Sequence, residues 1–437
     1  MKAILLGAGI SRRIKPLADK NFLEFLGRPL IKLQVKRLMD AGFDQVIVVG
    51  GRHNLQKLEE LFTQDDHVQV IEQQDLSLGM AGAVLSCEPL IMAGESIVVV
   101  SSNDVFSPDA FSKILKAKEH EKTDGALLGY KVSEYFPGGY LKTDDSGKIQ
   151  SIVEKPEPGK EPSNLVNLVV HYHRDALGFI NEIKNSKSEN DDLYEVAIDN
   201  LIQNGASYYA VSYNDYWQPI KYPWHILKVW KHFMPEKMIS ESSEVHESAV
   251  IKGEVIIEDG VKVFENAVIS GPAYIGKNSI IANNALVRDS YIGSDCVIGF
   301  STEIARSYLC KQVWTHKNYI GDSVIGQNVS FGSGAVTANL RLDEGDILIN
   351  IDDQKISTGS NKFGAIIGDD VRIGINTSIM PGIKIGTNSV IGSGIVISGD
   401  VPDNKFVNGK WDLEIKENKL KLKDINRKNL LNSLKKK

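Results

Sequence analysis

The chain has 437 residues, of which 42% are apolar and 24% are charged, and its formal net charge is −6. This composition is typical of a globular protein with two or three domains and excludes an intrinsically disordered chain. The acidic balance argues against nucleic acid as a partner, because a nucleic-acid-binding protein needs a basic face to displace counterions from phosphates.

The apolar runs and the cysteines indicate the cellular compartment in which the protein functions. No apolar run reaches the length of a membrane span, so we expect no membrane association. The three cysteines, Cys87, Cys296 and Cys310, match neither the spacing of a metal site nor a disulfide framework. A protein of the reducing cytoplasm is therefore expected.

Short apolar runs alternate with amphipathic stretches over about residues 1–238. The alternation predicts strands at Ala3–Leu6, Val46–Val49, Val68–Ile71 and Ile97–Val100, and helices at Pro29–Ala41 and Leu55–Phe62. Strand, helix and strand in this order indicate βαβ units, hence an α/β Rossmann-like domain with a parallel sheet covered on both faces. Ligands of such sheets bind beyond the carboxyl ends of the strands, here after Leu6 and Val100.

The first predicted strand leads into a glycine-rich loop, residues 7–17, with Lys20 soon after it. Backbone N–H groups around Gly7 and Gly9 could face a polyphosphate, and Arg13 and Lys20 could neutralise its charge. A Gly-x-Gly turn alone is weak support, since an ordinary tight turn with exposed lysines is nearly as common.

This loop and the segments after it resemble the nucleoside-diphosphate-sugar pyrophosphorylases, or sugar-1-phosphate nucleotidyltransferases. The matching blocks occur in the family's order and span nearly the whole N-terminal half. They are Gly9–Leu17 with Lys20, Leu26–Ile31, Gln74 with Gly79–Ala81, Asn103–Phe106, Gly139, Glu154–Pro156 and Asn167.

The resemblance implies three sets of site residues. The nucleotide would be bound by Gly7, Gly9, Ser11, Gln74 and Gly79, and the sugar phosphate by Gly139, Glu154 and Asn167. Asp104 would hold Mg²⁺, while Lys20 and Arg13 would be catalytic because they offset charge on the pyrophosphate leaving group. Nucleotidyl transfer depends mainly on such in-line positioning and charge neutralisation.

Two departures from the family pattern lie in the same half. The block Trp-x-Asp-x-Gly-x-Pro reads Trp217-Gln218-Pro219-Ile220-Lys221-Tyr222-Pro223, so Pro219 replaces an aspartate that joins the metal site. Asp215 is the nearby carboxylate that could substitute for it. Val169 replaces a glycine that follows the sugar-binding asparagine. These departures leave open a nucleotidyltransferase-like domain without activity.

A hexapeptide repeat fills about residues 246–410. Ile-Gly pairs keep a spacing of six from Ile367-Gly368 to Ile391-Gly392. A period of six is neither helical nor that of a flat strand, and it predicts a left-handed parallel β-helix with one inward aliphatic residue per face. A β-sandwich does not account for that period.

Residues 239–245 are expected to link the domains. The lysine-rich residues 411–437 are expected to form a solvated tail or a helix that packs on a neighbour.

Polar residues interrupt the repeat at Thr315–Asp322, and further polar blocks follow at Thr337–Leu340 and Asn361–Asp370. A lone histidine is more often structural than catalytic. His316, however, is flanked by polar residues, and it lies three residues before Tyr319 on an otherwise aliphatic scaffold. Neighbouring coils of a β-helix could bring these blocks together.

These blocks resemble the acetyltransferase domain of the bifunctional glucosamine-1-phosphate acetyltransferase/N-acetylglucosamine-1-phosphate uridyltransferases, and especially the archaeal-type enzymes. The resemblance implies that His316 takes a proton from the amino group of an amino-sugar 1-phosphate, which then attacks acetyl-CoA. Tyr319, Lys362 and Arg288 would bind the sugar phosphate, and Asn339 would orient the sugar or His316. Such acyltransferases are generally homotrimers.

Ala305, Ser330 and Ile375 depart from polar residues of the bacterial members, which leaves the amino sugar open. The sequence thus predicts a bifunctional enzyme that N-acetylates glucosamine or galactosamine 1-phosphate and transfers a nucleotidyl group from UTP or dTTP. The alternatives are an acetyltransferase with a degenerate first domain, or a non-catalytic regulatory subunit. Release of the CoA thiol from acetyl-CoA would distinguish a non-catalytic subunit, which releases none, from the two hypotheses that include an acetyltransferase.

Overall fold

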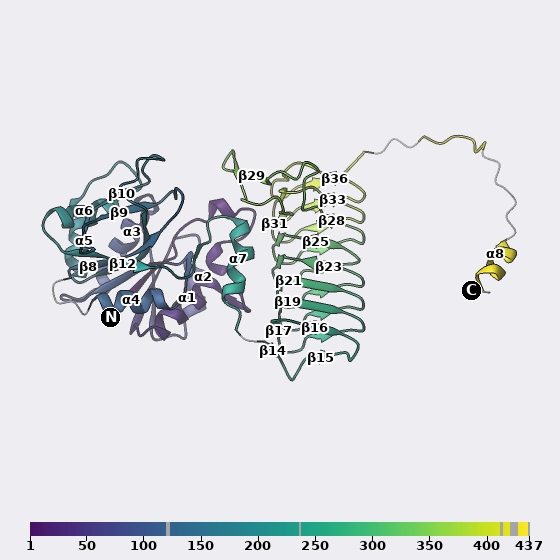
Figure 1. The fold of residues 1–437 in the computed structure, drawn as a ribbon, viewed down its shortest axis with the longest axis horizontal. Helices are drawn as coiled ribbons and strands as arrows, with labels where there is room; N and C mark the ends of the chain where they lie inside the picture. Colours follow the sequence, from purple (N-terminus) through teal and green to yellow (C-terminus); the bar gives the residue numbers. More distant parts are fainter. Residues whose placement is uncertain (119–122, 236, 411–413, 420–426, 436–437) are drawn as a thin grey trace.

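The N-terminal domain surrounds a mixed sheet, seen in the left half of Figure 1. The computed structural model describes residues 1–118, 123–235, 237–410, 414–419 and 427–435. The strands of this sheet are β1 Lys2–Leu6, β4 Gln45–Gly50, β5 Val68–Glu72, β6 Ile97–Ser101, β8 Gly125–Lys131, β9 Gly139–Thr143, β10 Ile149–Glu154, β11 Leu165–His173 and β12 Tyr208–Tyr213. The helices are α1 Leu30–Asp40, α2 Leu55–Phe62, α3 Gly79–Ser86, α4 Asp109–Ala117, α5 Ala176–Asn185, α6 Leu193–Gln203 and α7 Ile226–His232.

The strand order β10-β9-β11-β6-β1-β4-β5 combines parallel and antiparallel neighbours. Strands β1, β4, β5 and β6 are parallel to one another, which matches the predicted βαβ units. Strand β11 runs antiparallel to β6, β8 and β9, so the expectation of an entirely parallel sheet is wrong. The β8–β11 and β9–β10 pairs are also antiparallel, whereas the last strand, β12, lies parallel to β8 and follows α5 and α6 in the chain.

Apolar side chains cover both faces of this sheet. One core packs β1, β4 and β6 under α1, α2 and α4, and a second packs the opposite face under α3, α5 and α6. The central strands are therefore buried on both faces and consist of near-continuous apolar residues such as Ile97–Val100. Their carboxyl ends open onto the loops after Leu6 and Ser101, where a ligand can bind.

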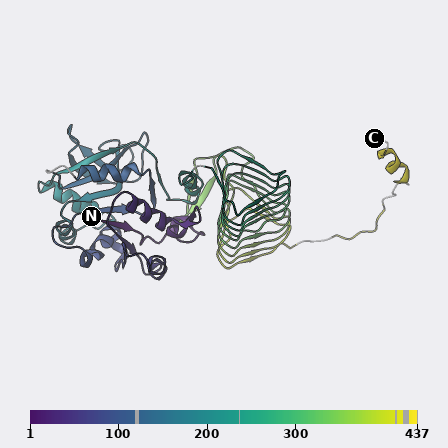
Figure 2. The same ribbon diagram turned by 90° about the horizontal axis from the view of Figure 1, so that it is seen from below.

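The second domain is a parallel β-helix, seen edge-on in Figure 1 and along its stack of coils in Figure 2. Its strands are β14 Met238–Ile239, β15 Glu244–Val245, β16 Val250–Lys252, β17 Val255–Ile257, β18 Lys262–Val263, β19 Val268–Ile275, β20 Ile280–Ile281, β21 Leu286–Ile292, β22 Val297–Ile298, β23 Glu303–Ala305, β24 Tyr308–Leu309, β25 Tyr319–Gly321, β26 Val324–Ile325, β27 Ser330–Phe331, β28 Val336–Thr337, β31 Ile366–Ile367, β32 Arg372–Ile373, β33 Ser378–Ile379, β34 Lys384–Ile385, β35 Val390–Ile391, β36 Val396–Ile397 and β37 Phe406–Val407. Equivalent strands of successive coils pair in parallel, so each coil takes about three hexapeptides.

The inward residues of the coils form one aliphatic core, of which Ile281, Ile298 and Ile373 are examples. The β-helix begins earlier than the domain limits drawn from the sequence. Strand β14 already pairs with β17, and β15 pairs with β18, although both lie at or within the residues expected to form a linker. The Ser- and Glu-rich composition of this first coil conceals its pairing, because its outward positions face solvent.

Outward tyrosines attach the β-helix to the N-terminal domain. Tyr274, Tyr291 and Tyr308 each precede an inward aliphatic residue, so the alternation of a strand turns their rings outward. They stack with ring centroids 4.6 and 4.7 Å apart. The Tyr308 hydroxyl donates to the Glu24 carbonyl at 2.6 Å, and Phe25 packs on the Tyr308 ring. The two domains therefore share a buried interface core.

A hairpin inserted in the β-helix also reaches this interface. It comprises β29 Leu348–Ile351 and β30 Gln354–Ser357, between β28 and β31. Ile347, Ile349 and Ile351 are buried in the interface core. In Figures 1 and 2 the hairpin lies between the two domains. Its tip, Asp352, therefore faces the glycine-rich loop of the first domain.

Smaller elements complete the fold: β2 Glu24–Phe25, β3 Arg28–Pro29, β7 Asp104–Phe106, β13 Trp217–Pro219 and α8 Arg427–Leu434. Helix α8 lies apart from both domains in Figure 1. Part of the expected tail, residues 411–413, 420–426 and 436–437, lies outside the described residues. In the part of the chain that the structure describes, no helix has the length and apolar character needed to cross a bilayer.

Candidate active sites

The glycine-rich loop is anchored beneath by hydrogen bonds to its neighbours. The Gly7 N–H donates to the Val49 carbonyl at 2.9 Å, and the Gly7 carbonyl accepts from the side-chain amides of Asn21 and Asn54. A Cβ at Gly7 would stand 3.0 Å from the Val49 oxygen, so this position needs glycine for close approach. Gly9 instead faces open space. Gly7 therefore supports the loop, and Gly9 lies at its accessible surface.

Ser11 fixes the next turn of the loop. Its backbone is left-handed, with φ of 51°, and its hydroxyl donates to Asp19 Oδ1 at 2.9 Å. The same hydroxyl accepts from the Lys20 N–H at 3.3 Å. Ser11 thus holds Lys20 close to the loop. Burial lowers the pKa of Lys20 to about 8, against the opposing attraction of Asp104 and Asp19.

Three cavities that share lining residues lie at this loop and beside Lys20. The first, the loop cavity, has a volume of about 500 Å³ and is lined by Gly9–Ile14, Lys20, Asp191, Lys221 and Asp352. Arg12, Arg13, Lys20 and Lys221 make it rich in cations, which suits a polyphosphate. Asp352 comes from the hairpin of the second domain, so both domains contribute to this cavity.

The second, the apolar cavity, has a volume of about 340 Å³ and shares Gly9 and Ile10 with the loop cavity. Its walls include Leu6, Gly79, Met80 and Val169. Gln74, which was expected to contact the base, is exposed and does not line this cavity.

The neighbouring residue Gln73 lines the apolar cavity instead. Its side-chain amide donates to the carbonyls of Asp75 and Gly79, at 2.9 and 2.8 Å. Sequence reasoning missed Gln73. The doublet Gln73-Gln74 was the available signal, since adjacent residues of a strand end face opposite sides.

The third, the carboxylate cavity, has a volume of about 260 Å³ and brings together the three residues expected to bind sugar phosphate. A Cβ at Gly139 would lie 2.8 Å from Glu154 Oε2, so glycine leaves room for that carboxylate. Asn167 and Gly139 come from the neighbouring strands β11 and β9. Lys20 and Lys221 line both this cavity and the loop cavity, which places cations where the two join.

A buried hydrogen-bond chain orients Asn167. Its Oδ1 lies 2.8 Å from His171 Nε2, and an amide oxygen can only accept, so His171 donates from Nε2. Burial lowers the pKa of His171 to about 3, so the ring is neutral and its Nδ1 accepts from the Tyr194 hydroxyl at 3.0 Å. The Asn167 side-chain N–H groups are thereby left to face the cavity. Neither His171 nor Tyr194 was expected from the sequence.

Glu195, on α6, is a second buried carboxyl group of this cavity. Burial and the nearby Glu154 raise the pKa of Glu195 to about 8, so it carries a proton at neutral pH. Burial also raises the pKa of Glu154. The sequence does not reveal this pair, because an acidic residue on a helix is usually solvated.

Asp104 lies on the carboxylate cavity with a fixed orientation. Its Oδ1 accepts from Trp217 Nε1 at 2.8 Å, and it faces Pro219 across the β7–β13 ladder. Asp215, the expected substitute for residue 219, lies on an exposed loop and does not line this cavity. Among the described residues, no cluster of three or more His, Cys, Asp or Glu side chains forms a metal site. Asp104 still fits Mg²⁺, which proteins commonly bind through one or two carboxylates together with substrate phosphates.

In the β-helix, Tyr319 and Asn339 meet across neighbouring coils. Asn339 Nδ2 donates to the Tyr319 hydroxyl at 3.1 Å and also to Asp322. Asp322 accepts two hydrogen bonds from the Arg306 guanidinium, at 2.6 and 2.7 Å. The structure therefore forms a polar group of four side chains, of which Asp322 and Arg306 were not predicted as site residues.

The remaining expected residues lie outside this polar group. His316 is exposed at the corner before β25, and Lys362 is exposed next to the hairpin. Within the described residues, neither side chain makes a hydrogen bond or ion pair. Arg288 is ion-paired with Glu303, at 2.6 Å. Lys362 nevertheless lies beside Asn339, because Leu340 bridges to Lys362 and the Phe363 N–H donates to the Asn339 carbonyl at 3.0 Å. Among the described residues, no hydrogen bond or ion pair joins the His316, Lys362 or Arg288 side chains to Tyr319.

Both halves of the chain match known protein families. The nucleotidyl transferase family matches residues 2–220, and the bacterial transferase hexapeptide family matches residues 254–289 and 364–399. A bifunctional sugar-1-phosphate nucleotidylyltransferase/acetyltransferase of Sulfurisphaera tokodaii is 32% identical over 93% of this chain and 99% of its own length. The bifunctional protein GlmU of Methanocaldococcus jannaschii is 31% identical over 93% and 97%. A UDP-glucose pyrophosphorylase crystallised with UDP-glucose aligns with 53% of this chain and 97% of its own, at 18% identity and a TM-score of 0.47.

Proposed function

We propose, because this chain belongs to the family of bifunctional sugar-1-phosphate nucleotidylyltransferase/acetyltransferases, that each domain carries one of the two activities. The three N-terminal cavities would join a nucleoside triphosphate, UTP or dTTP, to a sugar 1-phosphate. The β-helix would transfer an acetyl group from acetyl-CoA to an amino-sugar 1-phosphate, with glucosamine or galactosamine as the sugar. We place both reactions in the cytoplasm, because the three cysteines are free, which suits a reducing compartment.

In the nucleotidyl reaction, the apolar cavity would take the base and the loop cavity the phosphates. The sugar phosphate would lie in the carboxylate cavity, against Glu154, Asn167 and Gly139. Its phosphate oxygen attacks the α-phosphorus, and the bond to the leaving pyrophosphate breaks. Lys20 and Arg13 neutralise the leaving group. Mg²⁺, held by Asp104 and by substrate phosphates, would add charge neutralisation and orientation.

In the acetyl transfer, His316 would accept the proton of the sugar amine as that amine attacks the thioester carbonyl. Tyr319 and Asn339 would contact the sugar, with Lys362 and Arg288 near its phosphate. Because the β-helix belongs to the hexapeptide transferases, which generally trimerise, we propose a homotrimer in which neighbouring copies complete the site. Phe300 and Trp314 lie close to His316 and are 56% and 53% exposed, and exposed apolar groups of this kind favour contact with another chain.

The junction of the loop and carboxylate cavities is the observation that carries the first activity, because two substrates that react must meet there. The test is a pair of assays on one sample. Pyrophosphate release is followed with N-acetylglucosamine 1-phosphate, Mg²⁺ and each triphosphate, and thiol release with acetyl-CoA and each amino-sugar 1-phosphate. Release of both products supports the proposal. Thiol release alone would leave only an acetyltransferase, and release of neither product would favour a regulatory subunit.

The protonated state of Glu195 predicts a pH effect on the carboxylate cavity. Because the pKa of Glu195 is raised to about 8, its carboxyl group is neutral below that pH and negative above it. We expect the KM for sugar 1-phosphate to rise by roughly fivefold between about pH 7 and about pH 9, through charge repulsion. The variant Glu195→Gln should show a smaller rise in KM, because only the loss of the Lys20 charge remains over this range, whereas the exposed control Glu189→Gln should follow the native profile.

Loss of the Glu195 proton should also change the stability of the folded chain, which can be measured without substrate. The folded chain holds the Glu195 proton up to about pH 8, whereas the unfolded chain loses it near the ordinary value of 4.5. Between these values the unfolded state binds fewer protons, so this group lowers the free energy of unfolding as the pH rises. Glu195→Gln should therefore raise the Tm at about pH 9. An unchanged Tm together with an unchanged KM profile would contradict the assignment.

The hairpin tip predicts an effect of the second domain on the first. Asp352 shares the loop cavity with Arg12 and Arg13, where its carboxylate opposes an incoming polyphosphate. We expect Asp352→Asn to tighten UTP binding by roughly threefold at low salt and by less at high salt. Asp353→Asn removes the same charge one residue away, from a side chain that does not line the cavity. Equal effects of both variants in calorimetry would refute a specific role for Asp352.

A further inference from the structure

Two departures from the family's Trp-x-Asp-x-Gly-x-Pro block stand together beside Asp104. Pro219 occupies the aspartate position and pairs directly with Asp104 across the β7–β13 ladder. Lys221 occupies the glycine position two residues later. The chain has therefore lost a negative side chain and gained a positive one where the cavities join.

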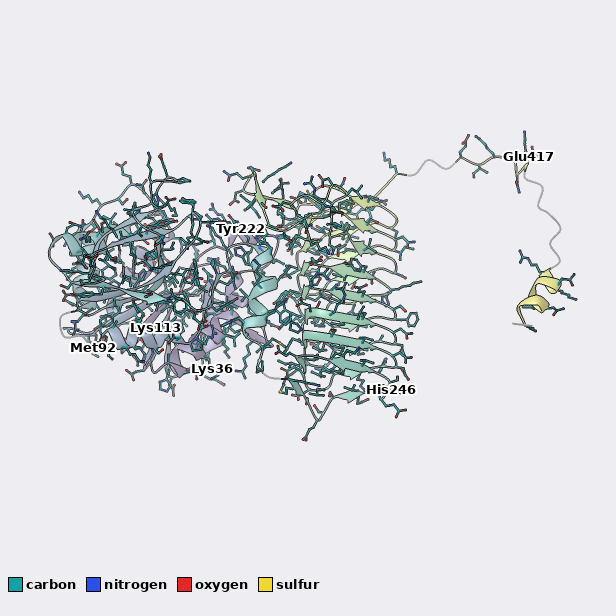
Figure 3. The ribbon with its side chains drawn as sticks, in the orientation of Figure 1. Lys36, Met92, Lys113, Tyr222, His246 and Glu417 are labelled. Carbon is teal, nitrogen blue, oxygen red and sulfur yellow. The ribbon has the colours of Figure 1, made fainter. Side chains whose placement is uncertain are left out.

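The backbone of the Lys221 turn is held by a ring from the next helical segment. His225 Nδ1 lies 2.7 Å from the Pro219 carbonyl and 3.2 Å from the Lys221 nitrogen. Burial lowers the pKa of His225 to about 4, so the ring is neutral and adds no charge beside Lys221. Tyr222, next along the chain, lies on the side of the domain that faces the β-helix (Figure 3). The turn is thus fixed close to the interface between the domains.

The Lys221 side chain points toward the proposed active site of the first domain. It lines both the loop cavity and the carboxylate cavity, and its Nζ lies 5.8 Å from the ring centroid of Phe136 on the carboxylate-cavity wall. Within the described residues, Lys221 makes no ion pair. Asp104 and Glu154 attract this ammonium from the same cavity without forming an ion pair with it. A half-buried ammonium with no ion pair favours an anionic ligand.

We propose that Lys221 is a catalytic residue of the nucleotidyl reaction, whose ammonium contacts the phosphates at the cavity junction and adds positive charge where the chain lacks a metal-holding aspartate at position 219. This inference rests on the proposed nucleotidyl transfer. A phosphate oxygen of the sugar phosphate forms the new bond to the α-phosphorus, and the bond to pyrophosphate breaks with its electron pair. No proton moves in that exchange. Lys221 and Lys20 flank the junction, so cations from two elements neutralise the charge.

If Lys221 contacts the phosphates, UTP binding should depend less on Mg²⁺ in this chain than in an enzyme whose metal is held by two carboxylates. UTP affinity is measured by calorimetry with excess Mg²⁺ and again with EDTA. The native chain should bind UTP under both conditions. Lys221→Met should weaken binding in EDTA by roughly tenfold and by less in Mg²⁺, while Lys221→Arg should restore it, because one lost ionic contact is worth about that factor. Lys160→Met, an exposed lysine paired with Glu157, is the matched control and should bind as the native chain does.

A second measurement follows the metal itself. Pro219→Asp would restore the carboxylate opposite Asp104 and should tighten Mn²⁺ binding to the UTP complex, as seen by electron paramagnetic resonance. If Lys221→Met binds UTP in EDTA as tightly as Lys160→Met does, the role of Lys221 is refuted while nucleotidyl transfer stands. If the native chain binds no UTP even with Mg²⁺, the proposed function itself fails at this site. Circular dichroism on each variant confirms that folding is unchanged.

Discussion

Asp104→Asn should lower pyrophosphate release by roughly 100-fold or more while leaving thiol release from acetyl-CoA at the native rate. The expected loss is large because Asp104 is the carboxylate that lies opposite Pro219 and would hold Mg²⁺ against the phosphates. The asparagine keeps an oxygen that can accept from Trp217 Nε1, as Asp104 Oδ1 does at 2.8 Å. The variant therefore removes the charge with little change in geometry. Both assays are run on the same sample at saturating substrates.

Asp215→Asn is the matched control for this variant. It removes an aspartate charge from the loop before β13, where a substitute for residue 219 was expected from the sequence. Since Asp215 does not line the carboxylate cavity, pyrophosphate release should be unchanged. Loss of activity in Asp215→Asn, with Asp104→Asn still active, would reverse the assignment of the metal-holding residue.

Local patterns in the sequence predicted much of the fold because they depend on residues close together in the chain. The amphipathic period of Leu55–Phe62 matches α2. The repeat of six residues predicted the β-helix, whose inward Ile and Val residues form its core. The expected parallel strands were found, but the antiparallel direction of β11 was not predicted. Strand direction depends on pairing between distant segments, which no local period records.

The candidate sites show the same division between local motif and tertiary packing. The glycine loop, Asp104 and Asn167 were recognisable because each lies in a short motif. The proton on Glu195 depends on burial by distant segments, and the approach of Asp352 to the loop cavity depends on how the domains pack. Sequence reasoning therefore selected family motifs and missed residues whose role comes from their surroundings. The roles of the motif residues remain predictions.

The two proposed sites lie in separate parts of the chain, although the domains share a core. The N-terminal cavities are lined by the first domain and by Asp352, whereas His316 stands at a corner of the β-helix. A change at one catalytic residue should therefore affect only its own reaction. A variant that impaired both would instead indicate damage to the shared interface, which circular dichroism and thermal melting would reveal.

His316→Asn should lower thiol release by roughly 100-fold to 10,000-fold, the usual contribution of a general base, while pyrophosphate release stays at the native rate. The amine of an amino sugar must lose a proton as it attacks the thioester, and His316 is the side chain proposed to accept it. His246→Asn is the control, because His246 is another exposed histidine of the β-helix, on the side away from the first domain (Figure 3). Native thiol release in His316→Asn would refute its role as base. If neighbouring copies complete the site in the proposed trimer, mixing inactive His316→Asn with inactive Tyr319→Phe and exchanging their subunits should restore part of the activity. No recovery would instead assign both residues to the site of the same copy.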